Sequence, residues 1–296
     1  MEVKEPKTFE VQLEKLKNRG CIIGDENYAL NVLRHINYYR FTAYFLPYKK
    51  NNDNYIKGTT FNNVHRTYEF DRKLRTLLFS VIEEIELMLR TQFSYYHAHK
   101  YGALGYMDEC NYNNRHNHEE FLKRLDRAVE KNKNQPFVSH HIENYGGNFP
   151  LWVIIELFTM NDLSIFYSDM PAVDQKNIAL NLFGTTYKIL PTWLHCLTIL
   201  RNYCAHYSRL YYTIFSIKPL TPLGFSYNLW KQIFDYILVL KFLYPYPEKW
   251  NIILVEPLNA LLEEYSDCIK LSHIGFPENW ISILKESIPK RKHNDK

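Results

Sequence analysis

One stretch of the sequence, residues 62–99, constrains the fold more than any other. Apolar and polar side chains alternate through it with the spacing of a helix, and the positions that define one face are Phe70, Leu74, Leu77, Val81, Ile85, Met88 and Gln92. Glu86 and Arg90 add a favourable pair at i,i+4. We therefore predict a single helix over these residues, the longest in the chain.

The composition favours the same class of fold. The chain has 296 residues, of which 46% are hydrophobic and 23% charged, and it holds only 10 Gly and 13 Pro. An all-β sandwich needs more turn-forming residues than this, so we predict an all-α protein. No internal repeat or long linker divides it. We expect one helical domain over 1–284 and a basic, disordered tail over 285–296.

Local signals place several of the other helices. Asp25 and Thr60 stand where N-caps are needed. Pro150 can begin a largely buried helix that runs on to residue 170, and Thr192 begins one that extends through residue 211. Shorter helices are predicted at 8–18, 118–132 and 172–184, and two or three more complete the chain.

The cysteines and the N-terminal sequence bear on the compartment. The five cysteines are scattered without a CxxC pair, which indicates neither a disulfide framework nor a zinc site. The N-terminus lacks an apolar leader region, and no run approaches the roughly 18 apolar residues of a membrane span. We expect a cytoplasmic protein without a membrane partner.

An aromatic stretch with an arginine is a candidate for contact with nucleic acid. The net charge of +4 permits an anionic partner. Tyr39 and Arg40 combine a flat ring with a cation, which can stack on unpaired bases and bind their phosphates. For most of the neighbouring tyrosines, bracing of the core is the alternative that we favour.

A polar cluster is predicted on the helix of residues 194–211. A helical wheel places Leu197, Leu200, Cys204, Tyr207 and Tyr211 on the face that packs inward. Asn202, His206 and Arg209 form the opposite stripe at i, i+4 and i+7, with Arg201 at its flank. This group of an amide, an imidazole and guanidinium groups is of a kind that binds phosphate. An ordinary solvated helix face would explain the same pattern.

The string LRNYCAHYSRLYY resembles the RxxxxH motif of HEPN ribonucleases, since four residues separate Arg201 from His206. Further segments resemble the Abi family of bacterial abortive-infection proteins: INYYRFTAYFLPY, FDRKLRTLLFSVIEEIELMLRTQFSYYHAHKYG, PLWVIIELFTMNDLSIFY and IGFPENW. Together they cover most of residues 8–284.

This resemblance implies an all-α, HEPN-like helical bundle with additional N- and C-terminal helices. It implies a metal-independent endoribonuclease of anti-phage defence, which needs no cofactor and carries Arg201 and His206 as catalytic residues. Asn202 then orients His206 or contacts the phosphate, although a helix-surface hydrogen bond would also explain it. Arg209 contacts phosphate, although an ion pair would explain Arg209 equally well. One imidazole cannot easily act as both acid and base across a phosphorus atom. We therefore expect a homodimer with a composite site.

The expected partners are RNA as substrate and a second copy of the chain. Unregulated cleavage would kill the host, so the resemblance also implies an antitoxin, either a protein or an inhibitory non-coding RNA. The main alternative is an RNA-binding or phage-sensing module that uses the same basic cleft without turnover.

A second alternative is a metal-dependent nuclease built on the histidine-rich part of the chain. Its candidate ligands are His97, His99, His116, His118, His140 and His141. No carboxylate or cysteine partners them at a recognisable ligand spacing, so we predict no metal site. Glu156 lies in an apolar run and is expected either to pair with Arg201 or Arg209 or to reach the surface.

Overall fold

A single long helix runs the length of the molecule in the computed structural model, which describes residues 5–222, 225 and 227–286. This helix, α4 (Phe61–Tyr101), has 41 residues and confirms the prediction for 62–99. At 1.5 Å per residue it is about 60 Å long. The Thr60 hydroxyl caps its first turn by accepting from the Asn63 N–H (3.2 Å), as predicted. It ends at Gly102, whose φ of +87° suits glycine.

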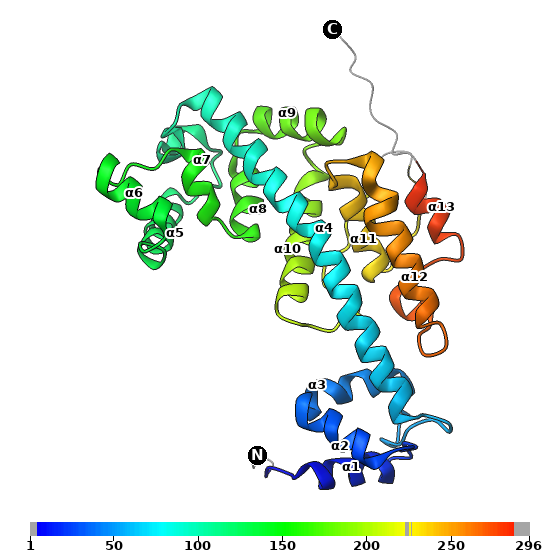
Figure 1. The fold of residues 1–296 in the computed structure, drawn as a ribbon. Helices are drawn as coiled ribbons and strands as arrows, with labels where there is room; N and C mark the ends of the chain where they lie inside the picture. The colour runs from blue at the N-terminus through cyan, green and yellow to red at the C-terminus, as the bar shows by residue number, and fades with distance from the viewer. Residues whose placement is uncertain (1–4, 223–224, 226, 287–296) are drawn as a thin grey trace.

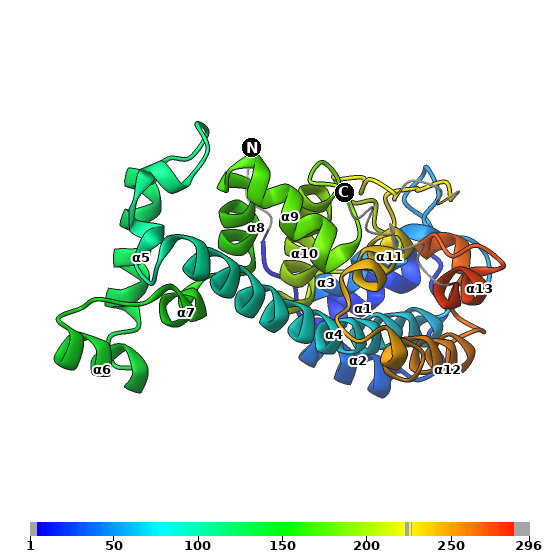
Figure 2. The ribbon, with the colours of Figure 1, turned by 90° about the horizontal axis from the view of Figure 1, so that it is seen from above.

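The other helices pack along α4 in three groups (Figures 1 and 2). One end carries α1 (Phe9–Asn18), α2 (Glu26–His35) and α3 (Tyr38–Thr42). The other end carries α5 (His118–Lys131), α6 (Pro136–Tyr145), α7 (Leu151–Ile154), α8 (Met160–Asp169) and α9 (Ala172–Phe183). The middle carries α10 (Leu190–Ala205), α11 (Ile233–Leu243), α12 (Glu256–Glu264) and α13 (Trp280–Lys285).

The described residues contain no β-strand, only two isolated bridges, which confirms the all-α fold. Short 3-10 turns and one π-helical turn, Asn251–Val255, join the helices. In the middle group α10 packs against α8, α4 and α11, and Trp193, Leu197 and Leu200 are buried in those contacts. The predicted tail falls largely on residues 287–296, outside the described part of the chain.

The helix predicted from Pro150 to residue 170 is wrong, because the chain breaks within it. After α7 a 3-10 turn, Ile155–Leu157, leads to α8, which begins at Met160. Thr159 caps α8 with a capping box, in which its side chain and that of Asp162 satisfy each other's backbone N–H groups. Arg90 of α4 donates to the carbonyls of Ile155 and Phe158 (2.5 and 2.7 Å), so the break is stabilised from α4.

The helix predicted through residue 211 ends earlier, at Ala205. Tyr207 adopts a left-handed conformation with φ of +57°. The Ser208 N–H donates to the Tyr203 carbonyl (2.8 Å) and the Tyr207 N–H to the Cys204 carbonyl (3.3 Å), which is the Schellman arrangement that closes a helix. His206 is therefore the C-cap residue. Tyr207 is 70% exposed, whereas the wheel predicted it to be buried.

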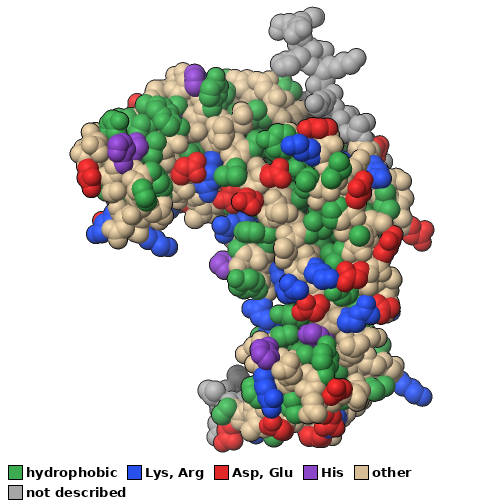
Figure 3. Space-filling model, in the orientation of Figure 1, with side chains coloured by type: hydrophobic (Ala, Val, Ile, Leu, Met, Phe, Trp, Pro, Cys, Tyr) green, Lys and Arg blue, Asp and Glu red, His purple; other side chains and the backbone are tan. Residues whose placement is uncertain are grey.

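The surface in Figure 3 is hollowed between the α5–α6 end and the α1–α3 end of the molecule. Lys and Arg side chains, with some acidic ones, gather at the waist where α1–α3 meet the middle group. No helix among the described residues combines the length and the apolar character needed to cross a bilayer.

Candidate functional site

The two residues of the RxxxxH motif lie at the C-terminal end of α10. His206 is exposed, and its ring makes no hydrogen bond with any described residue. Asn202 is exposed one turn before it, and the Asn202 backbone carbonyl accepts from the His206 N–H (2.9 Å). No hydrogen bond joins the Asn202 amide to the imidazole in the described structure. The imidazole is therefore open to solvent on a fixed backbone.

Arg201 is half-buried beside an acidic side chain of α4. Its Nε lies 3.5 Å from Glu86 Oε2, and its side chain is 32% exposed. Glu86 also pairs with Arg90 at 2.6 Å. Within the described residues, the two terminal nitrogens of Arg201 have no hydrogen-bond partner. The Nε edge of the guanidinium faces Glu86 as an ion pair without a hydrogen bond, while the other edge can receive an anion.

Of the two alternatives for Glu156, pairing with Arg201 or Arg209 is wrong. Glu156 is exposed on the 3-10 turn after α7, as the second alternative proposed. The sequence did predict that Glu86 pairs with Arg90. It gave no sign that the same carboxylate also reaches Arg201, because that contact depends on how α10 crosses α4.

The segment that follows His206 is fixed by a buried carboxylate of α4. Asp71 is fully buried and accepts hydrogen bonds from the backbone N–H groups of Leu210 (3.1 Å) and Tyr211 (2.7 Å). It also accepts from the Tyr44 hydroxyl (2.6 Å) and pairs with Arg75. Burial raises the pKa of the Asp71 carboxyl, while Arg75 and the other donors favour its charged form. The network ties residues 210 and 211 to α4.

Three arginines complete this attachment by donating to backbone carbonyls. Arg75 donates to Ser208 (3.2 Å), Arg40 of α3 to Tyr207, and Arg209 to Ala43 (2.8 Å). Burial lowers the pKa of Arg209. Arg40 and Arg209, both candidates for RNA binding, therefore also hold the chain in place, and Arg209 lies beyond the end of α10 rather than on its polar stripe. Tyr39, the third candidate, is 87% exposed on α3.

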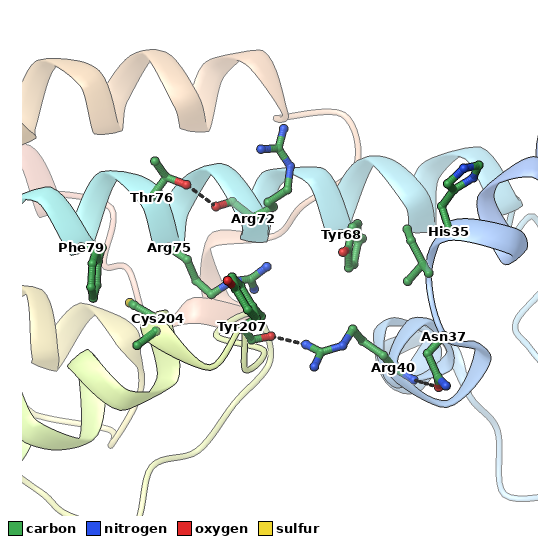
Figure 4. Close-up of a pocket in the computed structure, with 12 residues that line it drawn as sticks. His35, Asn37, Arg40, Tyr68, Arg72, Arg75, Thr76, Phe79, Cys204 and Tyr207 are labelled. Atoms are coloured by element: carbon green, nitrogen blue, oxygen red, sulfur yellow. Dashed lines mark hydrogen bonds between the residues drawn. The ribbon is translucent and has the colours of Figure 1, made fainter. Parts of the chain in front are cut away.

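A pocket of about 770 Å³ opens beside His206, between α2, α3, α4 and the end of α10 (Figure 4). Ala205 and Tyr207, the two neighbours of His206 in the chain, form part of its wall. Its basic lining residues are three arginines and a histidine, and no carboxylate lines it. The full lining is His35, Ile36, Asn37, Arg40, Tyr68, Arg72, Arg75, Thr76, Phe79, Cys204, Ala205 and Tyr207.

The cysteine in this wall is not a suitable nucleophile. Burial raises the pKa of the Cys204 thiol to about 12, so the thiolate is scarce at neutral pH. All five cysteines are free, and none forms a disulfide.

The histidine-rich region lies at the other end of α4. His116 and His118 are within hydrogen-bonding distance of each other (3.1 Å), and the Asp169 carboxylate lies 2.8 Å from His116. His97 is fully buried, and neither of its ring nitrogens has a partner. Among the described residues, no group of three or more His, Cys, Asp or Glu side chains is arranged to hold a metal ion.

Comparison with known families gives a match that spans the site. The family model described as Abi-like protein matches residues 31–212, from α2 to the segment after α10. This is more than half of the chain, and the protein therefore belongs to the Abi-like family. Membership indicates a role in abortive infection. Neither the curated proteins nor the solved structures contain a match to the chain.

Proposed function

We propose that this protein is a metal-independent endoribonuclease of an abortive-infection system, with Arg201 and His206 as its catalytic residues. The observation that carries the proposal is the state of these two side chains at the end of α10. His206 is exposed and unbonded, and Arg201 keeps two guanidinium nitrogens available beside Glu86. Membership in the Abi-like family supports the same function.

The chemistry needs little beyond these groups. In RNA the 2′-hydroxyl can attack the adjacent phosphorus once a base removes its proton. The bond from phosphorus to the 5′-oxygen then breaks, and an acid protonates the leaving oxygen. The products are a 2′,3′-cyclic phosphate and a 5′-hydroxyl. An imidazole exchanges protons near neutral pH, and a guanidinium binds phosphate oxygens through two parallel hydrogen bonds.

A second copy of the chain supplies the other half of this site. Residues at i and i+5 are separated by about 140° around a helix axis, so one helix end presents Arg201 and His206 in different directions. Two α10 ends that meet across a two-fold axis provide one imidazole for each proton transfer. Analytical ultracentrifugation at the concentration where RNA is cleaved should therefore give a dimer, and an active monomer would contradict the composite site.

The test of the activity uses His206→Ala and Arg201→Ala beside wild type. Growth arrest on expression and RNA fragments with cyclic-phosphate ends should appear with wild type and disappear with both variants, with losses of at least 100-fold in cleavage rate. His195→Ala is the matched control, because His195 is an exposed histidine on the same helix. It should cleave as wild type does, and cleavage by His206→Ala at the wild-type rate would contradict the proposal.

The same variants separate catalysis from the two alternatives. If His206→Ala loses toxicity and keeps RNA binding, the protein is an enzyme, and unchanged toxicity points to a binding or sensing module. Cleavage that EDTA abolishes would indicate the metal-dependent alternative. The proposed activity also requires restraint, and an RNA or protein antitoxin that covers the end of α10 would supply it.

A further inference from the structure

The pocket beside His206 has walls of two kinds, apolar rings and cations. Tyr68 and Phe79 of α4 and Tyr207 after α10 contribute aromatic side chains. In Figure 4 Tyr68 and Tyr207 lie on either side of the opening, and Arg40 reaches along a third side from α3. Flat rings of this kind can stack on a nucleobase, and such stacking tolerates any base.

The charge of the pocket is positive, but its arginines are not equivalent. Arg75 is neutralised by the buried Asp71, and Arg72 pairs with Glu69 and points away from the opening in Figure 4. Arg40 is exposed, and one of its terminal nitrogens donates to a neutral group, the Tyr207 carbonyl. Its other N–H groups have no partner among the described residues. Arg40 is therefore the cation best placed to receive a phosphate.

The position and size of the pocket fit one nucleotide of a strand. A volume of about 770 Å³ lies within the range that holds a ligand of this size. Ala205 and Tyr207, the neighbours of His206, line the pocket. A nucleotide held there would therefore be close, along the RNA strand, to the phosphate that reaches His206. A free mononucleotide has the same chemistry, but it gains nothing from this proximity.

We propose that this pocket is a nucleotide subsite of the RNA substrate, in which Tyr207 and Tyr68 stack on the base and Arg40 binds its phosphate. The proposal rests on the proposed ribonuclease function and names how the strand is held beside the catalytic groups. It assigns to Arg40 two tasks, the attachment of the loop and the contact with RNA. It adds Tyr207, which the sequence analysis placed in the core.

The test measures binding of a fluorescein-labelled, ten-nucleotide single-stranded RNA of mixed sequence to the full chain carrying His206→Ala, which prevents cleavage. Tyr207→Leu in this background should weaken binding roughly tenfold, because one base–ring stack is lost. Arg40→Gln keeps a donor for the Tyr207 carbonyl and removes the charge. It should weaken binding and reduce the slope of log K against log salt by about 0.7.

Tyr212→Leu is the matched control for the ring. Tyr212 is 43% exposed and has a left-handed backbone with φ of +56°, as Tyr207 has, but it does not line the pocket. It should bind as the parent does. The subsite is overturned if Tyr207→Leu and Arg40→Gln both bind the RNA with the parent's affinity and salt slope. A mononucleotide such as 5′-AMP that binds as tightly as the ten-nucleotide RNA would overturn the assignment to a strand.

The outcomes distinguish failure of the subsite from failure of the activity. If wild type cleaves RNA through His206 while the pocket variants bind normally, the subsite is wrong and the ribonuclease stands. If the pocket variants weaken binding while wild type yields no cyclic-phosphate ends, the subsite stands and the activity is wrong.

Discussion

Asp71 and His97, which lie in opposite halves of α4, are buried in opposite ways. In the first half, Asp71 pairs with Arg75 and receives hydrogen bonds from the Tyr44 hydroxyl and from backbone groups of the segment after α10. In the second half, His97 is packed among the rings of Tyr101, Tyr112 and Phe166, and neither ring nitrogen is bonded. Burial lowers the pKa of His97 to about 4, so it is neutral at pH 7.

The difference shows how each of these two side chains affects the arrangement of the segments around it. A buried charge with several donors fixes the arrangement of distant segments, because each donor must reach it for the charge to be tolerated. A buried neutral imidazole fixes no such arrangement and acts as a ring in an aromatic core. Asp71 lies in the part of α4 whose residues line the pocket beside His206.

Asp71→Ala tests the comparison with the largest effect. It leaves Arg75 as a buried charge without its partner and removes the acceptor of two backbone N–H groups. We expect the free energy of unfolding to fall by about 3–5 kcal/mol in urea denaturation. Glu69→Ala, which breaks the surface pair with Arg72 on the same helix, should cost less than about 1 kcal/mol. Equal losses in the two variants would contradict the distinct role of Asp71.

His97→Leu tests the role of the buried imidazole through the pH dependence of stability. The folded pKa of about 4 lies below the unfolded value of about 6.5, so protonation favours the unfolded chain. This contribution to stability is present above pH 6.5 and is lost as the pH falls toward 4. It corresponds to about 3 kcal/mol between pH 7 and pH 4.

The measurement is the difference in unfolding free energy between wild type and His97→Leu across that interval. At pH 7 the substitution should change stability by less than about 1.5 kcal/mol, because the volumes are similar. Between pH 7 and pH 4 the variant should lose less of its free energy of unfolding than wild type loses. Parallel pH profiles would contradict the lowered pKa of His97 in the folded protein.

Tyr207→Gly is the smallest test and concerns the backbone at the site. A residue other than glycine in the left-handed region at the end of a helix is strained by roughly 1 kcal/mol. Glycine should therefore raise the melting temperature slightly, while Tyr207→Ala, which keeps the strain, should not. A lower melting temperature for the glycine variant would mean that the Tyr207 ring stabilises the folded protein more than its backbone strains it.

The features that could be predicted from sequence are those set by nearby residues. The long helix follows from its own periodicity, and Thr60 and Asp25 cap helices by contacts within three residues. The break before α8 could not be predicted, because Arg90 reaches the carbonyls of Ile155 and Phe158 from more than 60 positions away. The end of α10 at Ala205 depends on Tyr207, a residue type that rarely adopts a left-handed conformation.

In the candidate site, too, features set by nearby residues could be predicted and features set by distant contacts could not. Arg201 and His206 are predicted from the motif, and the structure leaves His206 exposed and Arg201 half-buried. Glu86, the neighbour of Arg201, was missed as its partner because a charged residue in a helix reads as solvated until the packing of α10 is known. Asp71 and Arg75 were missed for the same reason, since at i,i+4 they look like an ordinary surface pair.

Two reciprocal hydrogen bonds join the region of α3 to the segment after α10, and they have a consequence for the architecture. Arg40 holds the carbonyl of Tyr207, and Arg209 holds the carbonyl of Ala43, so two segments separated by more than 160 positions each secure the other's main chain. Arg40 of α3 and the carbonyl of Ala43 thus help to fix the segment that follows His206. Removal of α1–α3 would take away the hydrogen bond from Arg40 to the Tyr207 carbonyl even though every residue of the RxxxxH motif remained intact.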